Sequence, residues 1–158
     1  MSQRIDHSLG KLRVLRAQVA LRARDPEAIV DKRLEQQVRR RFGDASLETI
    51  DRAIDAYSRT RATLVSNSPF TTAVVKTDRE LAAMTRRRAR AAGELGGRWI
   101  YVSQERFFST DPSEPQALKD LIHESAHNRP TSLDDPANLG QRGIYPERMA
   151  EYAIDEYP

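Results

Sequence analysis

Residues 121–127 constrain this chain more than any other part of its sequence. They read Leu-Ile-His-Glu-Ser-Ala-His, which places two imidazoles, His123 and His127, four residues apart with the carboxylate of Glu124 between them. On an α-helix, residues i and i+4 lie on one face, so the two imidazoles could share one metal ion. The spacing predicts a helix here, with Glu124 turned toward the open side of that ion.

The residues around this segment favour such a helix. Ser113 and Gln116 have the spacing of a capping box, Pro115 falls in the first turn, and residues 128–130 are typical of a helix end. An apolar stripe runs between these ends and consists of Ala117, Leu118, Leu121, Ile122 and Ala126. The alternative is an amphipathic helix on which both histidines are merely solvated. Two of the chain's three histidines fall in the motif, which favours the metal-binding interpretation.

A helix with this HExxH pattern is suited to zinc-assisted hydrolysis. Two neutral imidazoles and one carboxylate hold Zn²⁺ and leave a coordination position for water, whose pKa falls from ~15.7 toward ~7 on binding. Glu124 is the candidate general base, which takes the proton of the attacking water and later passes it to the leaving amine. One zinc ion is therefore the expected cofactor, and a protein or peptide is the expected substrate.

Composition limits the remaining possibilities. With 158 residues, 39% hydrophobic and 31% charged, the chain is expected to form one domain over residues 1–158, with residues 1–10 flexible. It has no cysteine, so His, Asp and Glu are the strong metal ligands that remain. No apolar run reaches the ~18 residues of a membrane span, and the charged N-terminus lacks the pattern of a signal peptide. We expect a protein that is cytoplasmic or is delivered by a specialised secretion system, with no membrane partner.

Arginine dominates the basic residues, since only four of the 26 Lys and Arg residues are lysine. The densest clusters lie at residues 39–41 and 86–90. Guanidinium groups bind oxyanions well, so an Arg-rich helical module that binds nucleic acid or an acidic protein partner is an alternative function. Both clusters fall in segments that read as helix, lie near Asp and Glu, and lack interleaved aromatic residues. These features favour a solvated helix face over a nucleic-acid interface.

The pattern of apolar residues predicts an α+β fold that is mainly α. Helices are expected over residues 9–41, with a break at Asp25-Pro26, and over residues 46–64. Gly43 is expected to end the first helical stretch, and Pro146 to begin a terminal helix.

A small β-sheet is expected next to the motif helix. Residues 98–102, Arg-Trp-Ile-Tyr-Val, are the best strand candidate, and residues 70–75 also have strand character. Residues 78–92 read as helix or as irregular basic surface. A strand beside the motif helix, such as 98–102, could bind an extended substrate by pairing along its edge.

A zinc site needs a third protein ligand, which is expected downstream of the two histidines. A loop aspartate and a glutamate on a second helix would both suit, so the residues alone leave the choice open. The acidic candidates are Asp134 and Asp135 in the loop after the motif helix, and Glu147, Glu151, Asp155 and Glu156 on the terminal helix.

Four segments follow one another in a recognisable order. They are Ile100-Tyr101-Val102 with Phe107-Phe108, the HExxH segment 121–127, residues 131–135, and residues 149–153. This succession resembles the deuterolysin and peptidyl-Lys metalloendopeptidase family, the aspzincins, from about Leu12 onward. The family has an IYV and FF segment, an LIHExxH helix, a Gly-Thr-x-Asp loop that ends in Tyr-Gly, and an Asn-Ala-Asp-x-Tyr segment. The resemblance implies a zincin-like fold with N-terminal helical hairpins and a small β-sheet.

By position, the resemblance also implies the roles of the site residues. His123 and His127 would bind zinc, and Glu124 would be the general base. Asp135 would be the third ligand, with Asp134 as its alternate. Glu151 stands near the aspartate of the family's last segment. It is therefore implied as an outer partner that orients a histidine or, like Glu147, as an alternate ligand.

The chain departs from the family pattern in the loop after the motif. Pro130 precedes Thr131 where the family has Gly, and residues 137–140 replace the Tyr-Gly that ends the loop. The family's tyrosine is thought to help hold the oxyanion, and Tyr145 is the nearest substitute. A zincin-like scaffold that no longer cuts is therefore an alternative. Lacking cysteines, the chain looks more like the bacterial versions, which often occur as effector or toxin modules carried by dedicated delivery systems.

Overall fold

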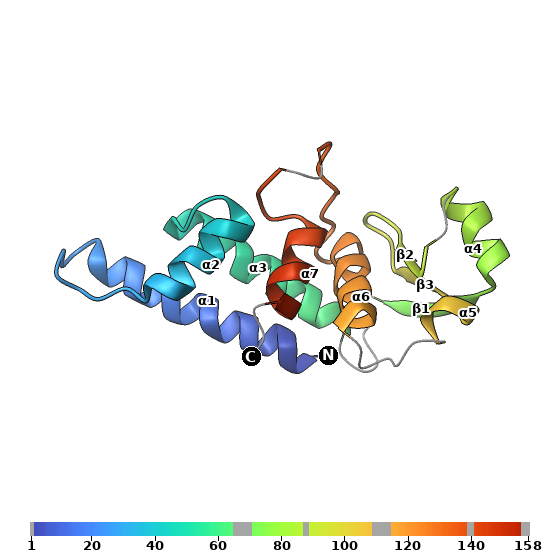
Figure 1. Ribbon diagram of the computed structural model, residues 1–158, viewed down its shortest axis with the longest axis horizontal. Helices are drawn as coiled ribbons and strands as arrows, with labels where there is room; N and C mark the ends of the chain where they lie inside the picture. Colours follow the sequence, from blue (N-terminus) through green and yellow to red (C-terminus); the bar gives the residue numbers. More distant parts are fainter. Residues whose placement is uncertain (1, 65–70, 87–88, 109–114, 139–140, 156–158) are drawn as a thin grey trace.

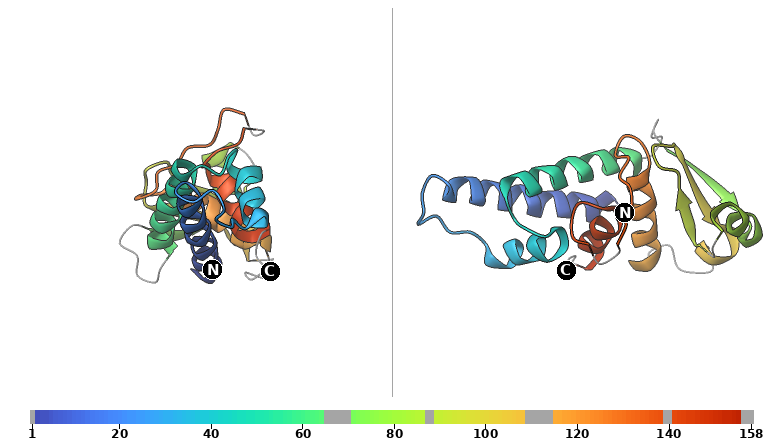
Figure 2. Two further views of the ribbon diagram at one scale, coloured as in Figure 1. Left: turned by 90° about the vertical axis from the view of Figure 1, so that its left-hand side faces the viewer. Right: turned by 90° about the horizontal axis from the view of Figure 1, so that it is seen from above.

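Three helices form the N-terminal part of the chain in the computed structural model, which describes residues 2–64, 71–86, 89–108, 115–138 and 141–155. They are α1 (Ser2–Arg22), α2 (Lys32–Phe42) and α3 (Leu47–Leu64). The helices α1 and α3 lie side by side in the views of Figures 1 and 2. The helical stretches predicted on either side of Gly43 are confirmed, with the break in the first one near Asp25-Pro26.

Local caps set the ends of α2. The side chain of Asp31 accepts hydrogen bonds from the backbone N–H groups of Arg33 and Leu34, at 2.9 and 3.1 Å. Gly43 ends the helix with a φ of +103°, a conformation that favours glycine. Ile29 had been assigned to the helical pattern, but it lies before this cap and is exposed.

The N-terminal end of the chain is helical and packed, so the prediction that residues 1–10 are flexible was wrong for residues 2–10. Ile5 and Leu9 are buried in the helical core, and Arg61 of α3 forms an ion pair with Asp6. Burying an Ile or Leu side chain contributes about 1.5–3 kcal/mol, which offsets the entropy lost when a chain end is ordered.

Three strands form a small mixed sheet, so the α+β, mainly α class is confirmed. They are β1 (Thr72–Lys76), β2 (Ala91–Gly93) and β3 (Trp99–Ser103), in the order β1-β3-β2. The central strand β3 pairs in parallel with β1 and antiparallel with β2. Both edges of β3 are therefore occupied, and the prediction that this strand binds substrate along its edge was wrong. The strand next to the motif helix is β2.

The first arginine cluster forms a solvated face of α2 at Arg39 and Arg40, as predicted, but Arg41 and the second cluster depart from the prediction. The helix α4 (Asp78–Thr85) ends before the second cluster, with Arg86 in the left-handed region at φ 55°. Arg87 and Arg88 lie outside the described residues. In the first cluster, Arg41 is largely buried and forms ion pairs with two acids of the terminal helix. The physical reason is that α2 packs against that helix, which turns one of its arginines inward.

The motif helix α6 (Pro115–His127) lies between the N-terminal helices and the small sheet, as Figures 1 and 2 show, and it contributes to two hydrophobic cores. Ile122 and Ala126 belong to the helical core, together with side chains of α7 (Pro146–Asp155). Ala117 and Leu121 belong to a second core, whose other members are Ala91, Ile100, Val102 and, from the short helix α5 (Gln104–Phe107), Phe107. The predicted capping residue Ser113 lies outside the described residues. None of the helices in the described part of the chain combines the length and apolar character needed to cross a bilayer.

Candidate metal centre

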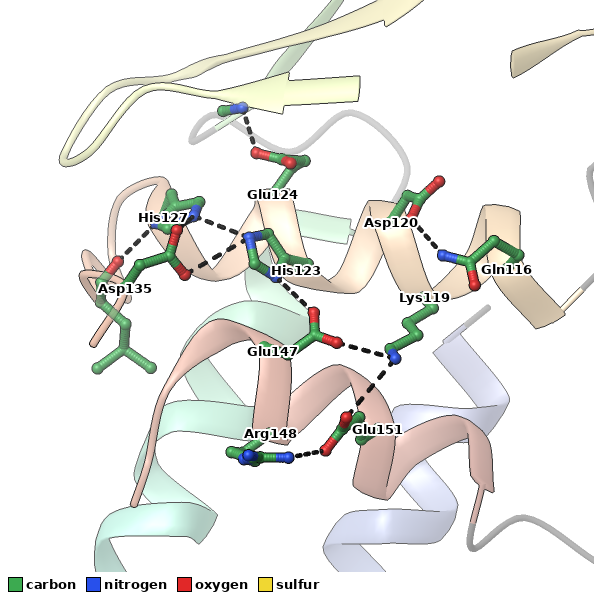
Figure 3. A network of polar contacts seen from close by, with 12 residues as sticks. Gln116, Lys119, Asp120, His123, Glu124, His127, Asp135, Glu147, Arg148 and Glu151 are labelled. Carbon is green, nitrogen blue, oxygen red and sulfur yellow. Dashed lines mark hydrogen bonds and ion pairs between the residues drawn. The ribbon is translucent and has the colours of Figure 1, made fainter. Parts of the chain in front are cut away.

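The two histidines of α6 point toward one another (Figure 3). Their Nε2 atoms lie 3.1 Å apart, and their side chains are 16% and 11% exposed, for His123 and His127 respectively. Potential ligand atoms of His123, Glu124 and His127 all lie within 4.8 Å of one another. This group could therefore hold a metal ion.

The carboxylate of Asp135 faces both histidines from the segment after α6 (Figure 3). Its Oδ1 lies 3.7 Å from Nε2 of His123, and its Oδ2 lies 3.6 Å from Nε2 of His127. Ligand atoms bound tetrahedrally to one zinc ion at about 2.0–2.2 Å are separated by about 3.3–3.6 Å. The Asp134 carboxylate instead accepts a hydrogen bond from the backbone N–H of Asp135, at 2.8 Å. The structure thus brings Asp135, and not Asp134, to the histidines.

The chain reaches this position because residues 128–133 fold back onto the end of α6. The N–H of Leu133 donates to the carbonyl of Ala126 at 2.9 Å, which closes the return. Thr131 is buried, and its hydroxyl forms a 3.1 Å hydrogen bond with that of Thr60 on α3. These contacts fix the backbone one and three residues before the acidic pair.

Each histidine has a second contact that turns its Nε2 toward the other. Nδ1 of His127 lies 2.8 Å from the carbonyl oxygen of Leu133, which can only accept, so the ring carries its proton on Nδ1 and presents a lone pair at Nε2. Nδ1 of His123 lies 3.3 Å from a carboxylate oxygen of Glu147 on α7, an ion-pair contact without the alignment of a hydrogen bond. Glu147 therefore lies on the far side of His123 from Asp135, outside the group of candidate ligand atoms.

The electrostatic environment of His123 favours positive charge. Burial alone lowers the pKa of His123, but the carboxylates of Glu147, Glu124 and Asp135 outweigh it and raise the pKa above its ordinary value. Contact with His123, supported by Lys119, lowers the pKa of Glu147 to about 2 despite its partial burial. A cation bound between the imidazoles would therefore meet a negative potential.

Glu124 points from α6 toward the sheet (Figure 3). Its side chain is largely buried, and its carboxylate accepts a hydrogen bond from the backbone N–H of Gly93 in β2. A Cβ atom at position 93 would lie 2.6 Å from the carbonyl oxygen of Glu124. Only glycine lets the strand approach the helix this closely. The need for glycine at position 93 cannot be predicted from the sequence, because the local pattern does not reveal which strand will meet α6.

Replacement of Gly93 tests this close approach. We expect Gly93→Ala to lower the free energy of unfolding by about 1–3 kcal/mol, because the added carbon meets a backbone atom that has little room to move. Chemical denaturation measures the loss. Gly10→Ala is the matched control, because a Cβ atom there meets nothing within 4 Å and alanine favours a helix. A loss for Gly93→Ala no larger than that for the control would contradict the packing described.

The prediction that Glu151 binds the metal or orients a histidine was wrong. Its carboxylate is bound by Arg41 at 2.9 Å. It is also bound by Arg148 at 2.7 Å, and Lys119 lies 3.8 Å away (Figure 3). Glu151 and Glu147 share a face of α7 as predicted, but the position of α7 against α6 places Glu147 beside the histidine. Glu151 instead joins α7 to α2.

Tyr145 precedes α7 and is half-buried, with its ring close to Gly143. In the described part of the chain, its hydroxyl forms no hydrogen bond with the two histidines or with Asp135. Its role in holding an oxyanion therefore stays a prediction.

Asp120 is a carboxylate of α6 that the sequence reasoning missed. Its Oδ1 accepts a hydrogen bond from Gln116 at 2.7 Å, and its buried Oδ2 has no hydrogen-bond partner among the described residues. Burial raises the pKa of Asp120 above its ordinary value, although Gln116 and the nearby Arg90 act in the opposite direction. No local pattern marks this residue, because its burial arises only when the helix is packed.

We expect Asp120→Asn to raise the melting temperature at pH 7, by roughly 1–2 °C. The raised pKa means that the ionised carboxylate disfavours the folded state, so stability falls as the pH rises through the folded-state pKa. The neutral amide avoids this loss. The gain should shrink below pH 4, where the aspartate is protonated in both states. Thermal unfolding of the variant and the unchanged protein at pH 7 and below pH 4 measures the difference in melting temperature. An equal difference under the two conditions would contradict the explanation.

Comparison of this chain with known protein families, curated proteins and solved structures finds no match. The chemistry of the site must therefore be argued from its own residues.

Proposed function

We propose that this chain is a zinc-dependent endopeptidase of the aspzincin type. The observation that carries the proposal is the convergence of three side chains, with Nε2 of His123 and Nε2 of His127 on one side and the Asp135 carboxylate on the other. Two imidazoles and one carboxylate are a donor set that catalytic zinc sites use, and they leave one coordination position open.

Three further features fit a zinc ion better than a solvated histidine pair. The separations of 3.1–3.7 Å between the ligand atoms are close to the edges of a zinc tetrahedron. The carbonyl of Leu133 and the carboxylate of Glu147 hold the ring nitrogens that face away from the site, as the outer partners of metal-bound histidines do. The surrounding carboxylates also favour positive charge at His123.

The residues of the chain would divide the reaction between them. A zinc ion in such a site supplies Lewis acidity, which polarises the substrate carbonyl and makes water more acidic. Glu124 would take a proton from the water that attacks the peptide carbon. It would then pass that proton to the amine nitrogen as the carbon–nitrogen bond breaks. The N–H of Gly93 would orient the Glu124 carboxylate for both transfers.

The position of β2 suggests how an extended peptide would bind. In the described residues, β2 pairs with β3 on one side only, and its other side lies against Glu124 of α6. Because Glu124 already binds the N–H of Gly93, an extended segment would run alongside the Glu124 carboxylate rather than pair with that N–H, with a peptide carbonyl near the two histidines. A protein in unfolded form is therefore the expected substrate.

Hydrolysis of unfolded casein tests the proposal. We expect the zinc-loaded protein to cleave casein, a chelator such as 1,10-phenanthroline to remove the activity, and added zinc to restore it. Elemental analysis should find one zinc ion per chain. Cleavage that persists after the metal has been removed, or a purified protein that takes up no zinc, would refute the assignment.

A further inference from the structure

A basic hollow on the surface of α2 lies outside the candidate metal centre. It has a volume of about 590 Å³ and draws its walls from two separate parts of the chain, α2 and the segment before α7. Its lining residues are Arg33, Gln36, Gln37, Arg39, Arg40 and Arg142. No carboxylate is among the described residues that line it, so four arginines surround one concave surface.

The part of this positive charge that comes from Arg33 and Arg142 is not explained by ion pairs within the fold. Arg41 of the same helix binds acids of α7 and so joins the two helices. In the hollow, Arg39 forms an ion pair with Glu35 at 2.7 Å. Arg33 and Arg142 form no ion pair with any described residue. Like charges gathered on one surface repel each other unless an anion lies between them.

A buried amide in the wall also has unmet hydrogen-bonding capacity. Gln37 is only 8% exposed, and its Oε1 has no hydrogen-bond partner in the described structure. The oxygen itself is buried beneath the wall, so a ligand in the hollow could reach this amide only at its nitrogen, which donates hydrogen bonds to anionic oxygens.

The hollow is held in shape from both sides. A Cβ atom at Gly43, just after α2, would lie 3.5 Å from Cβ of Arg142, so the segment before α7 contacts the end of α2. The carbonyl of Gln141 accepts a hydrogen bond from Arg148 of α7 at 3.5 Å. The arginines from the two parts of the chain are therefore placed before any ligand binds.

We infer that this hollow binds a small anion that carries two or more phosphate groups. Guanidinium groups match phosphate oxygens in pairs of hydrogen bonds, and several of them suit a multiply charged ligand. The volume is within the range of small-molecule sites. None of the described residues that line the hollow is aromatic, so they offer no platform on which nucleic-acid bases could stack.

Titration calorimetry with inorganic tripolyphosphate tests this inference on the full chain. We expect saturable binding of one anion per chain, and binding at least about tenfold weaker for the double variant Arg33→Ala/Arg142→Ala. Arg13→Ala/Arg24→Ala is the matched control, because both residues are exposed, carry the same charge and lie outside the hollow. The control should bind as tightly as the unchanged protein. Equal weakening in the two double variants would mean non-specific attraction and overturn the inference, as would an absence of binding.

A third variant separates ligand binding from folding. Gln37→Met keeps the volume of the side chain but removes the amide, so it should weaken tripolyphosphate binding several-fold without lowering the melting temperature. Unchanged binding in this variant would remove Gln37 from the site and overturn the inferred role of its amide. Tighter binding of single-stranded DNA than of tripolyphosphate would also overturn the inference, in favour of a polymer-binding surface. Glu124→Gln should bind tripolyphosphate normally, so this inference and the proposed peptidase activity fail independently.

Discussion

Glu124→Gln is expected to reduce casein hydrolysis by about 10²–10⁴-fold, the usual contribution of a general base, while one zinc ion per chain is retained. Glutamine has nearly the same shape and can still accept the hydrogen bond from Gly93, but it cannot take up a proton from water. The Glu124 carboxylate also lies within 4.8 Å of ligand atoms of both histidines, so geometry alone permits a second role as a ligand. Activity and zinc content measured on the same sample distinguish the base from a ligand.

Glu48→Gln is the control for this experiment, because Glu48 is an exposed glutamate of α3 far from the site in sequence. It should leave both activity and zinc content unchanged. Loss of zinc in Glu124→Gln would mean that Glu124 is a ligand. Retention of most of the activity would mean that another residue is the base, and Asp120, which has a buried carboxylate oxygen on α6, is the first to test.

Asp135→Ala is expected to weaken zinc binding by more than about 100-fold, whereas Asp134→Ala should have an effect below about tenfold. Loss of an outer partner of a metal ligand typically costs about 10–100-fold, and loss of a ligand should exceed that. Asp135 faces both histidines, but Asp134 only accepts a hydrogen bond from its neighbour's N–H. The two variants remove the same group from adjacent positions, so they control for the change in charge.

Competition with a chromophoric chelator measures these affinities, and circular dichroism checks that each variant is folded. Glu147→Gln should fall between the two aspartate variants, because Glu147 contacts His123 from outside the ligand group. An effect of Asp134→Ala equal to that of Asp135→Ala would show that the loop reorganises around the metal. A larger effect for Glu147→Gln than for Asp135→Ala would place the third ligand on α7.

Much of the helical structure could be predicted from local patterns. The apolar stripe of α6, the proline at the start of α7 and the glycine at the end of α2 all act through contacts within a few residues. The failures have a common cause. The ordering of the first ten residues and the burial of Arg41 depend on the elements that pack against them. A lone Ile5 among polar neighbours gives no local indication that it will be buried.

The acids around the site show the same limit. Glu147 and Glu151 are four residues apart on one face of α7, so local spacing does not distinguish between them as metal ligands. The packing of α7 places one beside His123 and surrounds the other with cations. The resemblance to the aspzincins favoured Asp135 over Asp134, and the return of residues 128–133 onto α6 brings that carboxylate to the histidines.

The sequence by itself determined that His123, Glu124 and His127 would project from one helix, because the 3.6-residue repeat makes neighbours of side chains four positions apart. Only the tertiary structure decided which carboxylate joins them, which strand meets the base, and which arginines surround an open hollow. These groups lie far apart along the chain or on separate elements, and their meeting depends on how buried surfaces pack.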